Sequence, residues 1–109
     1  MAAHIVVLTT TDTAEGASGL ARAAVEARAA ACAQIDGPIR STYWWDGALQ
    51  EEQEWRVVYK LPAEKYAELE ALIKRVHSYD TPEIISADIP RGSAEYLRWL
   101  DTETGESAR

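Results

Sequence analysis

Cysteine, basic residues and long apolar runs are all scarce in this sequence. Cys32 is the only cysteine among 109 residues, so the chain can form no internal disulfide, and we expect a reducing compartment. The net charge of -7 disfavours phosphate backbones and anionic membranes, because binding to either needs an excess of lysine and arginine. The longest early apolar run, Ile5 to Leu8, is far too short to cross a bilayer. We therefore expect no nucleic-acid partner, no membrane partner and, because the first residues lack a signal-peptide pattern, a cytoplasmic location.

Motifs of catalysis and of tight metal binding are missing as well. No Cys-x-x-Cys, His-x-x-x-His or histidine-rich tract is present, so the sequence holds no preformed metal-binding motif. The glycines at Gly16 and Gly19 lie inside a predicted helix and do not form a phosphate-binding loop. With two histidines and no recognisable nucleophile and base, the sequence predicts a protein that is not an enzyme.

What the chain does contain is an alternation of strand-like and helix-like segments. The β-branched run at the start is apolar on both faces, which is typical of a central strand. Asp12 with Glu15 predicts a helix N-cap, and Pro62 fits the first turn of a second helix. Gly37-Pro38 predicts a bulge, bend or edge within the second strand. We expect strands over residues 4–10, 32–45, 49–60 and 84–89, and helices over 13–30, 62–76 and 93–100.

This order of elements is the ferredoxin-like split βαβ pattern, followed by one terminal helix. Right-handed crossovers place both main helices on one face of a four-stranded antiparallel sheet. We therefore predict an α+β fold and a single domain over residues 1–109, with a flexible tail from about 102 to 109. Acylphosphatases share this fold class, but they use an asparagine to orient water, and this chain contains none.

The second and third strands are predicted to form an unusually long hairpin. Asp46-Gly47 between them is typical of a tight type I′ turn. Each strand has ten or more residues, against a usual five or six, so two helices cannot cover the whole length. Tyr43, Trp44 and Trp45 next to the turn would then form an exposed apolar patch of the kind that marks an interface. We expect these aromatics at a contact between copies of the chain; the alternative is that the last helix, with Trp99, folds back over them.

Three segments of the sequence resemble one known family. The first is Tyr43-Trp44-Trp45-Asp46-Gly47, followed by Glu54 and Lys60, which resembles a Tyr-x-Trp-(Glu/Asp)-Gly hairpin with a downstream Glu and Lys. The second, residues 77–84, resembles a His-Pro-Tyr-x-x-Pro-Glu-Ile segment, and the third is Ala30-Ala31-Cys32 at the end of the first helix. The family is CutA, the divalent-cation tolerance proteins, and the resemblance runs from about residue 5 to residue 100.

The resemblance implies more than a fold. It implies a homotrimer held by hairpins that pair across subunits, a similarity in assembly to PII-type signalling trimers, and a role in tolerance of copper and other divalent cations. Two departures weaken a metal site: Ser78 replaces the usual proline, and Thr9 and Thr10 stand where some members carry a cysteine. No metal is expected to be needed for folding, because a chain of this size buries enough surface by itself.

Cys32 and His77 are the candidate metal ligands, since copper prefers thiolate and imidazole donors. The alternatives are that Cys32 is a small buried hydrophobe and that His77 interacts with the carbonyls at the end of its helix. In a trimer, a residue near the three-fold axis is presented three times, so one weak ligand can form a site. Strand alternation predicts that Cys32 and Gln34 point away from the helices, while Ala33 and Ile35 face them.

A polar cleft between subunits is the second candidate site. Glu54, Lys60, Tyr79 and Glu83 are expected to lie along it, closed by a neighbouring hairpin. Such a cleft leaves open an alternative function, a PII-like trimeric sensor that binds a small ligand. The plainer alternative is an ordinary ion pair of Glu54 with Lys60 or with Arg56.

Overall fold

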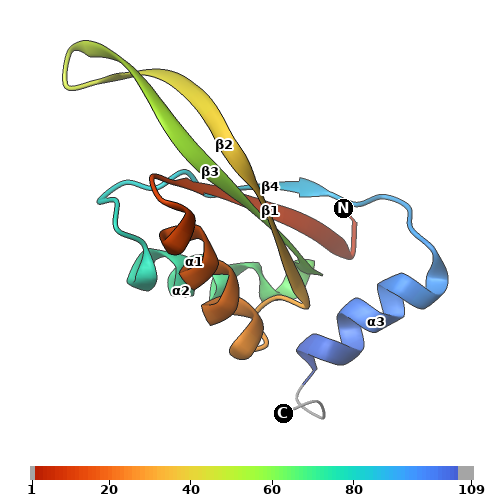
Figure 1. Ribbon diagram of the computed structural model, residues 1–109. Coiled ribbons are helices and arrows are strands. Elements are labelled where there is room, and N and C mark those ends of the chain that lie inside the picture. Colours follow the sequence, from red (N-terminus) through yellow and green to blue (C-terminus); the bar gives the residue numbers. More distant parts are fainter. Residues whose placement is uncertain (1, 106–109) are drawn as a thin grey trace.

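The computed structural model describes residues 2–105 and confirms the α+β, ferredoxin-like architecture (Figure 1). The four strands form one antiparallel sheet in the order β2-β3-β1-β4. The apolar strand predicted to be central, β1, lies between β3 and β4. In chain order the elements are β1 (His4–Thr11), α1 (Ala14–Glu26), β2 (Cys32–Trp45), β3 (Ala48–Pro62), a 3₁₀ turn (Ala63–Lys65), α2 (Tyr66–Val76), β4 (Ile85–Asp88) and α3 (Ala94–Thr104).

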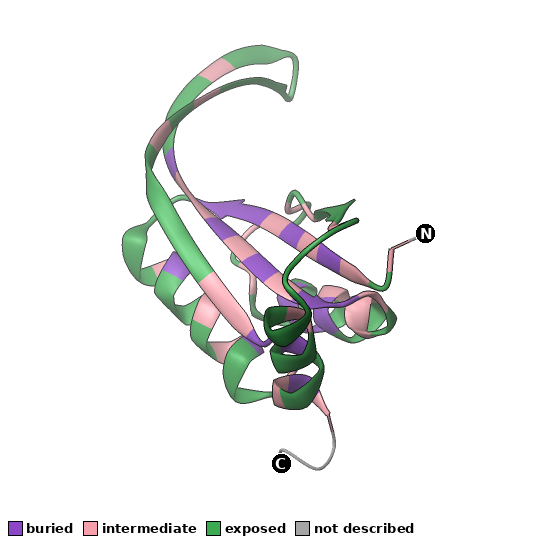
Figure 2. Ribbon diagram, turned by 90° about the vertical axis from the view of Figure 1, so that its right-hand side faces the viewer, coloured by how far each residue is buried: buried purple, intermediate pink, exposed green. Residues whose placement is uncertain are grey.

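The core lies between one face of the sheet and the helices α1 and α2. Buried and less buried residues alternate along the strands (Figure 2). The odd-numbered residues of β1 and β3 share the face toward the helices, and Val7, Val57 and Tyr59 on it are fully buried. The buried positions of α1 are mostly alanine, which lets the helix approach the sheet closely. The buried Tyr59 hydroxyl donates a hydrogen bond of 3.1 Å to the backbone oxygen of Leu20 in α1. We call the opposite face of the sheet, away from α1 and α2, the open face.

Helix α1 is shorter at both ends than the sequence predicts. Its N-cap is Thr13 instead of Asp12, and the Thr13 hydroxyl accepts a hydrogen bond of 2.9 Å from the backbone N–H of Gly16. At the other end, Arg28 adopts a positive φ of 62°, and the N–H of Ala29 donates to the carbonyl of Ala24 at 3.0 Å. This is a Schellman end with an arginine where glycine is usual. The predicted end at residue 30 was therefore wrong.

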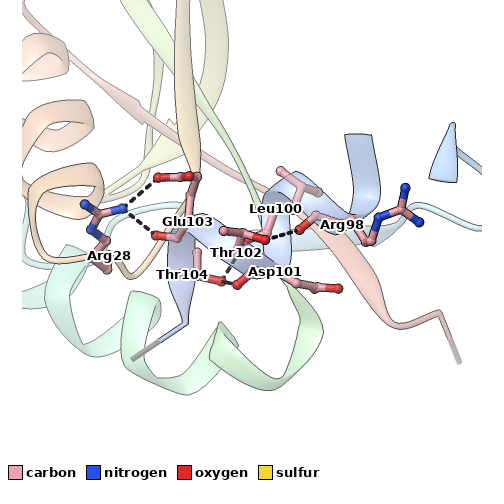
Figure 3. Close-up of polar contacts among 7 residues, drawn as sticks. All are labelled: Arg28, Arg98, Leu100, Asp101, Thr102, Glu103 and Thr104. Carbon is pink, nitrogen blue, oxygen red and sulfur yellow. Dashed lines mark hydrogen bonds and ion pairs between the residues drawn. The ribbon is translucent and has the colours of Figure 1, made fainter. Parts of the chain in front are cut away.

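Helix α3 is longer than predicted and is tied to the end of α1. Ser93 caps it, and Leu100 and Thr104 are buried. The Arg28 guanidinium donates to the Glu103 carboxylate at 2.8 Å and to the Glu103 backbone oxygen at 3.1 Å (Figure 3). The prediction of a flexible tail from residue 102 was thus wrong for residues 102–104, which complete the helix; residues 106–109 lie outside the described part of the chain.

The hairpin extends well beyond the rest of the sheet. Strand β1 pairs with β3 only between Trp55 and Pro62, whereas β2 accompanies β3 as far as the turn. We call the overhanging part, residues 39–54, the arch, because it curves as it leaves the sheet (Figure 2). Positive φ angles at Asp46 (52°) and Gly47 (76°) confirm the type I′ turn, and a register shift between Asp36 and Ile39 confirms the irregularity predicted at Gly37-Pro38.

The aromatic residues of the arch are left uncovered. Trp44 is 72% exposed and Trp45 57% exposed, and α3 lies at the opposite end of the molecule from the turn (Figure 1). The alternative that the last helix folds back over them was wrong. Trp99 instead stacks on Tyr96 of its own helix, with ring centroids 5.6 Å apart.

Candidate functional site: an acidic cleft beneath the arch

A cleft of about 690 Å³ opens between the arch, the end of β1 and the loop that follows α2. Thr10 and Glu54 contribute to it from the open face of the sheet. Two of the arch aromatics, Tyr43 and Trp45, line the cleft. The cleft is therefore formed by the overhang itself and would not exist in a ferredoxin-like protein with a short hairpin.

The cleft is strongly acidic. Five carboxylates line it, and none of its described lining residues is lysine, arginine or histidine. Oxygen donors in an excess of negative charge attract cations, and they suit hard cations better than soft ones. The five are Asp12, Glu52, Glu54, Asp80 and Glu83.

Glu54 and Tyr79 form a buried polar contact at the root of the arch. Glu54 is only 6% exposed, although it begins the part of β3 that β1 no longer accompanies. The Tyr79 hydroxyl donates a hydrogen bond of 2.7 Å to the Glu54 carboxylate. Burial, and then the neighbouring Glu54 carboxylate, raise the pKa of Tyr79 well above its ordinary value, because a phenolate here would be desolvated and repelled.

His77 fixes the loop against β1. Its Nδ1 accepts a hydrogen bond of 3.0 Å from the backbone N–H of Tyr79, so the proton is assigned to Nε2, which donates to the backbone oxygen of Thr10 at 2.8 Å. The ring thus contacts β1 instead of the carbonyls of its own helix, which was the alternative prediction. Both ring nitrogens are engaged within the protomer, and a role for His77 as a metal ligand stays a prediction.

Glu83 completes the predicted group on the cleft wall, where the Thr10 hydroxyl donates to its carboxylate at 3.4 Å. The structure therefore brings Glu54, Tyr79 and Glu83 together. Lys60 does not join them within the protomer, because six residues along a strand span roughly 20 Å.

The ion pairs predicted as the plain alternative are also not formed. Lys60 donates to the side-chain oxygen of Gln34, and Arg56 pairs with Asp36 at 3.6 Å. Glu54 is bound by Tyr79 in place of either cation. The prediction of an ion pair between Glu54 and Lys60 or Arg56 was therefore wrong.

Cys32 lies at the other end of the sheet from the cleft. It pairs with Lys60 across β2 and β3 and shares the open face with Gln34, as strand alternation predicted. Its sulfur lies 3.6 Å from the hydroxyl of Tyr96, which reaches this corner of the face from α3. Burial, and then the hydrogen bond with Cys32, raise the pKa of Tyr96 to about 12.

Cys32 and His77 cannot share a metal ion within one protomer, since they lie at opposite ends of the sheet. Across residues 2–105, no group of three histidine, cysteine, aspartate or glutamate side chains is arranged to hold a metal ion. A metal role for Cys32 in the assembled protein stays a prediction.

Sequence reasoning missed several cleft residues, of which Asp12, Glu52 and Asp80 carry charge. Asp12 follows β1 and Asp80 lies in the loop after α2, and these two loops meet at one end of the sheet in the predicted topology. Glu52 faces the cleft because it shares a face of β3 with Glu54. The topology and the alternation together held enough information to place all three.

Comparison with known proteins settles the family. The family model described as CutA1 divalent ion tolerance protein matches residues 5–103. The chain belongs to this family. The divalent-cation tolerance proteins CutA of Archaeoglobus fulgidus and Thermus thermophilus are 37% and 39% identical to it over 98 and 100 residues. These alignments cover 90% and 92% of this chain, and 95% and 97% of the relatives.

Solved CutA structures have the same fold. The CutA structure from Archaeoglobus fulgidus superposes with a TM-score of 0.90 at 35% identity, covering 94% of this chain and 99% of that one. The CutA1 structure from Oryza sativa gives a TM-score of 0.92 at 34% identity, covering 96% of each chain. The relatives from Archaeoglobus fulgidus and Thermus thermophilus are named for cation tolerance and not for a catalysed reaction. No helix within the described residues has the length and apolar character needed to span a membrane.

Proposed function

We propose that this CutA protein acts in cation tolerance as a homotrimer that binds divalent cations weakly in its acidic cleft. The observation that carries the proposal is the gathering of five carboxylates around one cleft without a basic residue among the described lining. Weak binding is expected because no three histidine, cysteine, aspartate or glutamate side chains in the described chain are arranged to hold one metal ion.

The donor chemistry favours hard cations in this cleft. Carboxylate oxygens suit Mg²⁺, Ca²⁺ and Mn²⁺, whereas Cu(I) prefers sulfur. A copper role would therefore belong to Cys32, with three copies brought together by the trimer, or to His77 after a local rearrangement. Substitutions at Cys32 or His77 should then affect copper binding, and substitutions of the cleft carboxylates should affect the binding of hard cations.

The trimer is proposed from the arch. Trp44 and Leu49 face each other across the hairpin and are 72% and 58% exposed, on the side opposite to Tyr43 and Trp45. The strand segment Ala48–Glu54 also has a pairing partner on its β2 side only. An exposed apolar pair on a ribbon with unpaired backbone is a surface that another chain can cover.

The cation proposal is tested by titrating Mn²⁺, Ca²⁺ and Cu²⁺ into the protein while following tryptophan fluorescence, since Trp45 lines the cleft. Mn²⁺ should quench the wild type, and the double variant Asp80→Asn, Glu83→Gln should bind it at least tenfold more weakly. The matched control is Glu95→Gln, an exposed carboxylate on α3 outside the cleft. Equal Mn²⁺ affinity in the double variant and the wild type would contradict the assignment of the cleft.

The PII-like alternative is less well supported. Nucleotides and carboxylate metabolites are anions, and the cleft offers them five negative charges. Adenine nucleotides added in the same titration should leave the fluorescence unchanged. The cytoplasmic location, expected from the single cysteine and from the lack of a signal-peptide pattern, stays a prediction.

A further inference from the structure

We infer that Lys60 of a neighbouring copy enters the acidic cleft and makes it a shared site between two protomers. The inference rests on the proposed trimer and names the residue that one copy contributes to the cleft of the next. It starts from the open face of the sheet, because the cleft and Lys60 both lie on that face.

Strand β3 carries both partners of the inferred contact. Glu54 and Lys60 are six residues apart on an unbroken stretch of β3, so they point to the same side of the sheet. The register shift that interrupts the hairpin adds its extra residue to β2 and leaves β3 in phase. Each protomer therefore presents an acidic end and a basic end on one continuous surface.

Lys60 stands out among the cations of this surface. Arg56, on the same face of β3, is paired with the Asp36 carboxylate at 3.6 Å. Lys60 contacts only a neutral amide oxygen, that of Gln34, although it is already half-buried. It is the one lysine or arginine on the described open face without a carboxylate partner.

The group that a neighbouring copy inserts into the cleft should carry a positive charge. A protein surface that closes over five carboxylates must remove water from them, which is costly unless positive charge arrives with it. A lysine can supply that charge on a long flexible stem whose methylenes pack against Trp45 and Tyr43. One ammonium leaves most of the negative charge in place, so cation binding and assembly remain compatible.

The separate positions of the acidic cleft and of Lys60 on the open face also fit a closed ring of copies. Because the acidic cleft and Lys60 lie at different places on the same face, each copy can give one lysine and receive another. Such a contact joins two different patches, the acidic cleft of one copy and the Lys60 region of the next. Contacts of this kind form a closed ring when repeating the rotation between neighbours returns to the first copy. A three-fold arrangement then satisfies every cleft with one Lys60.

Charge exchange tests the contact. Lys60→Glu should raise the concentration at which the trimer half-dissociates at least tenfold in 0.1 M salt, measured by analytical ultracentrifugation. Adding Asp80→Lys, which places a cation in the exposed acidic loop, should restore most of that loss. Arg75→Glu, on the outer helix α2, is the control and should leave dissociation unchanged; circular dichroism checks that each variant is folded.

Zero-length carbodiimide cross-linking gives an independent readout. In the wild-type trimer, peptide mass spectrometry should find Lys60 joined to Glu54, Asp80 or Glu83 in the cross-linked oligomer and not in the monomer. A wild-type trimer that tolerates Lys60→Glu and gives no such cross-link would overturn this inference and leave the trimer standing. A wild-type protein that is monomeric throughout would instead overturn the proposed assembly.

Discussion

Single residues at the root of the arch decide how the hairpin leaves the sheet. Glu54 is the last residue of β3 before β1 pairing begins, and it is held by Tyr79 from the loop after α2. That loop is in turn held to β1 through His77 and the Thr10 backbone oxygen. The root of the arch is thus a small hydrogen-bonded network in which each residue positions the next. Disrupting this network should lower the free energy of unfolding.

Removing the Tyr79 hydroxyl should therefore destabilise the fold. Tyr79→Phe leaves the Glu54 carboxylate buried without its donor and should lower the free energy of unfolding by about 1 to 3 kcal/mol. The matched control is Tyr66→Phe, whose hydroxyl contacts Glu70 one turn along α2, and which should cost roughly 0.5 kcal/mol or less. Urea unfolding measures both, and equal losses in the two variants would show that Tyr79 has no special role.

The same contact predicts a loss of stability at high pH. The pKa of Tyr79 is raised on folding, so its contribution is complete below pH 10, the ordinary tyrosine pKa, and is lost as the pH rises through the higher folded-state value. A spectrophotometric titration of the native protein should find fewer than the five tyrosines of the chain ionised at pH 11. Full ionisation of all five at that pH, in protein that remains folded, would refute the assignment.

At the scale of elements, local sequence predicted the hairpin well and the helix ends poorly. The bounds of β2 and the turn at Asp46-Gly47 are as predicted, because alternation and turn chemistry are local properties. The end of α1 was missed because Arg28 takes the conformation that glycine usually signals. Its partner Glu103 lies 75 residues away, so no local pattern could reveal the contact or the full length of α3.

Two substitutions at Arg28 separate the backbone conformation from the ion pair. Both Arg28→Ala and Arg28→Gly lose the contact with Glu103, but only glycine adopts a positive φ without strain. Arg28→Ala should therefore be less stable than Arg28→Gly by about 1 kcal/mol in the free energy of unfolding. If alanine proves as stable as glycine there, the Schellman end is not the conformation in solution.

The turn makes a similar prediction. Gly47 has a φ of 76°, and a Cβ added there would meet nothing within 4 Å, so any cost of substitution comes from the backbone. Gly47→Val should cost more than about 1 kcal/mol, because a β-branched residue is strained at positive φ. Gly47→Asn, which tolerates this conformation, is the control and should cost clearly less; thermal melts of the two variants decide the point.

At the scale of the whole molecule, the arch accounts for both the shape and the proposed assembly. The chain is 46 Å long but only 26 Å and 22 Å across, and the hairpin supplies the excess length (Figure 1). The arch also divides its aromatics, with Trp45 toward the cleft and Trp44 on the other face. The prediction that all three aromatics lie at a contact between copies stays a prediction, but strand alternation places Trp44 on the face opposite to Tyr43 and Trp45.

Trp44 should be an energetic centre of the contact between copies. Trp44→Ala should raise the protein concentration at which half of the trimer dissociates at least tenfold, as truncation of a buried interface tryptophan does. Val25→Ala, an exposed apolar residue on α1, is the control and should leave assembly unchanged. Sedimentation of both variants over a range of concentrations tests this, and equal behaviour would remove Trp44 from the interface.

Native mass spectrometry with Mn²⁺ tests the central claim most directly, because it reports assembly and bound cations together. The account predicts a species at three times the protomer mass of 12.1 kDa, carrying Mn²⁺ adducts that largely disappear in the double variant Asp80→Asn, Glu83→Gln. A monomer mass, or a trimer whose adducts are the same in the wild type and the double variant, would contradict it.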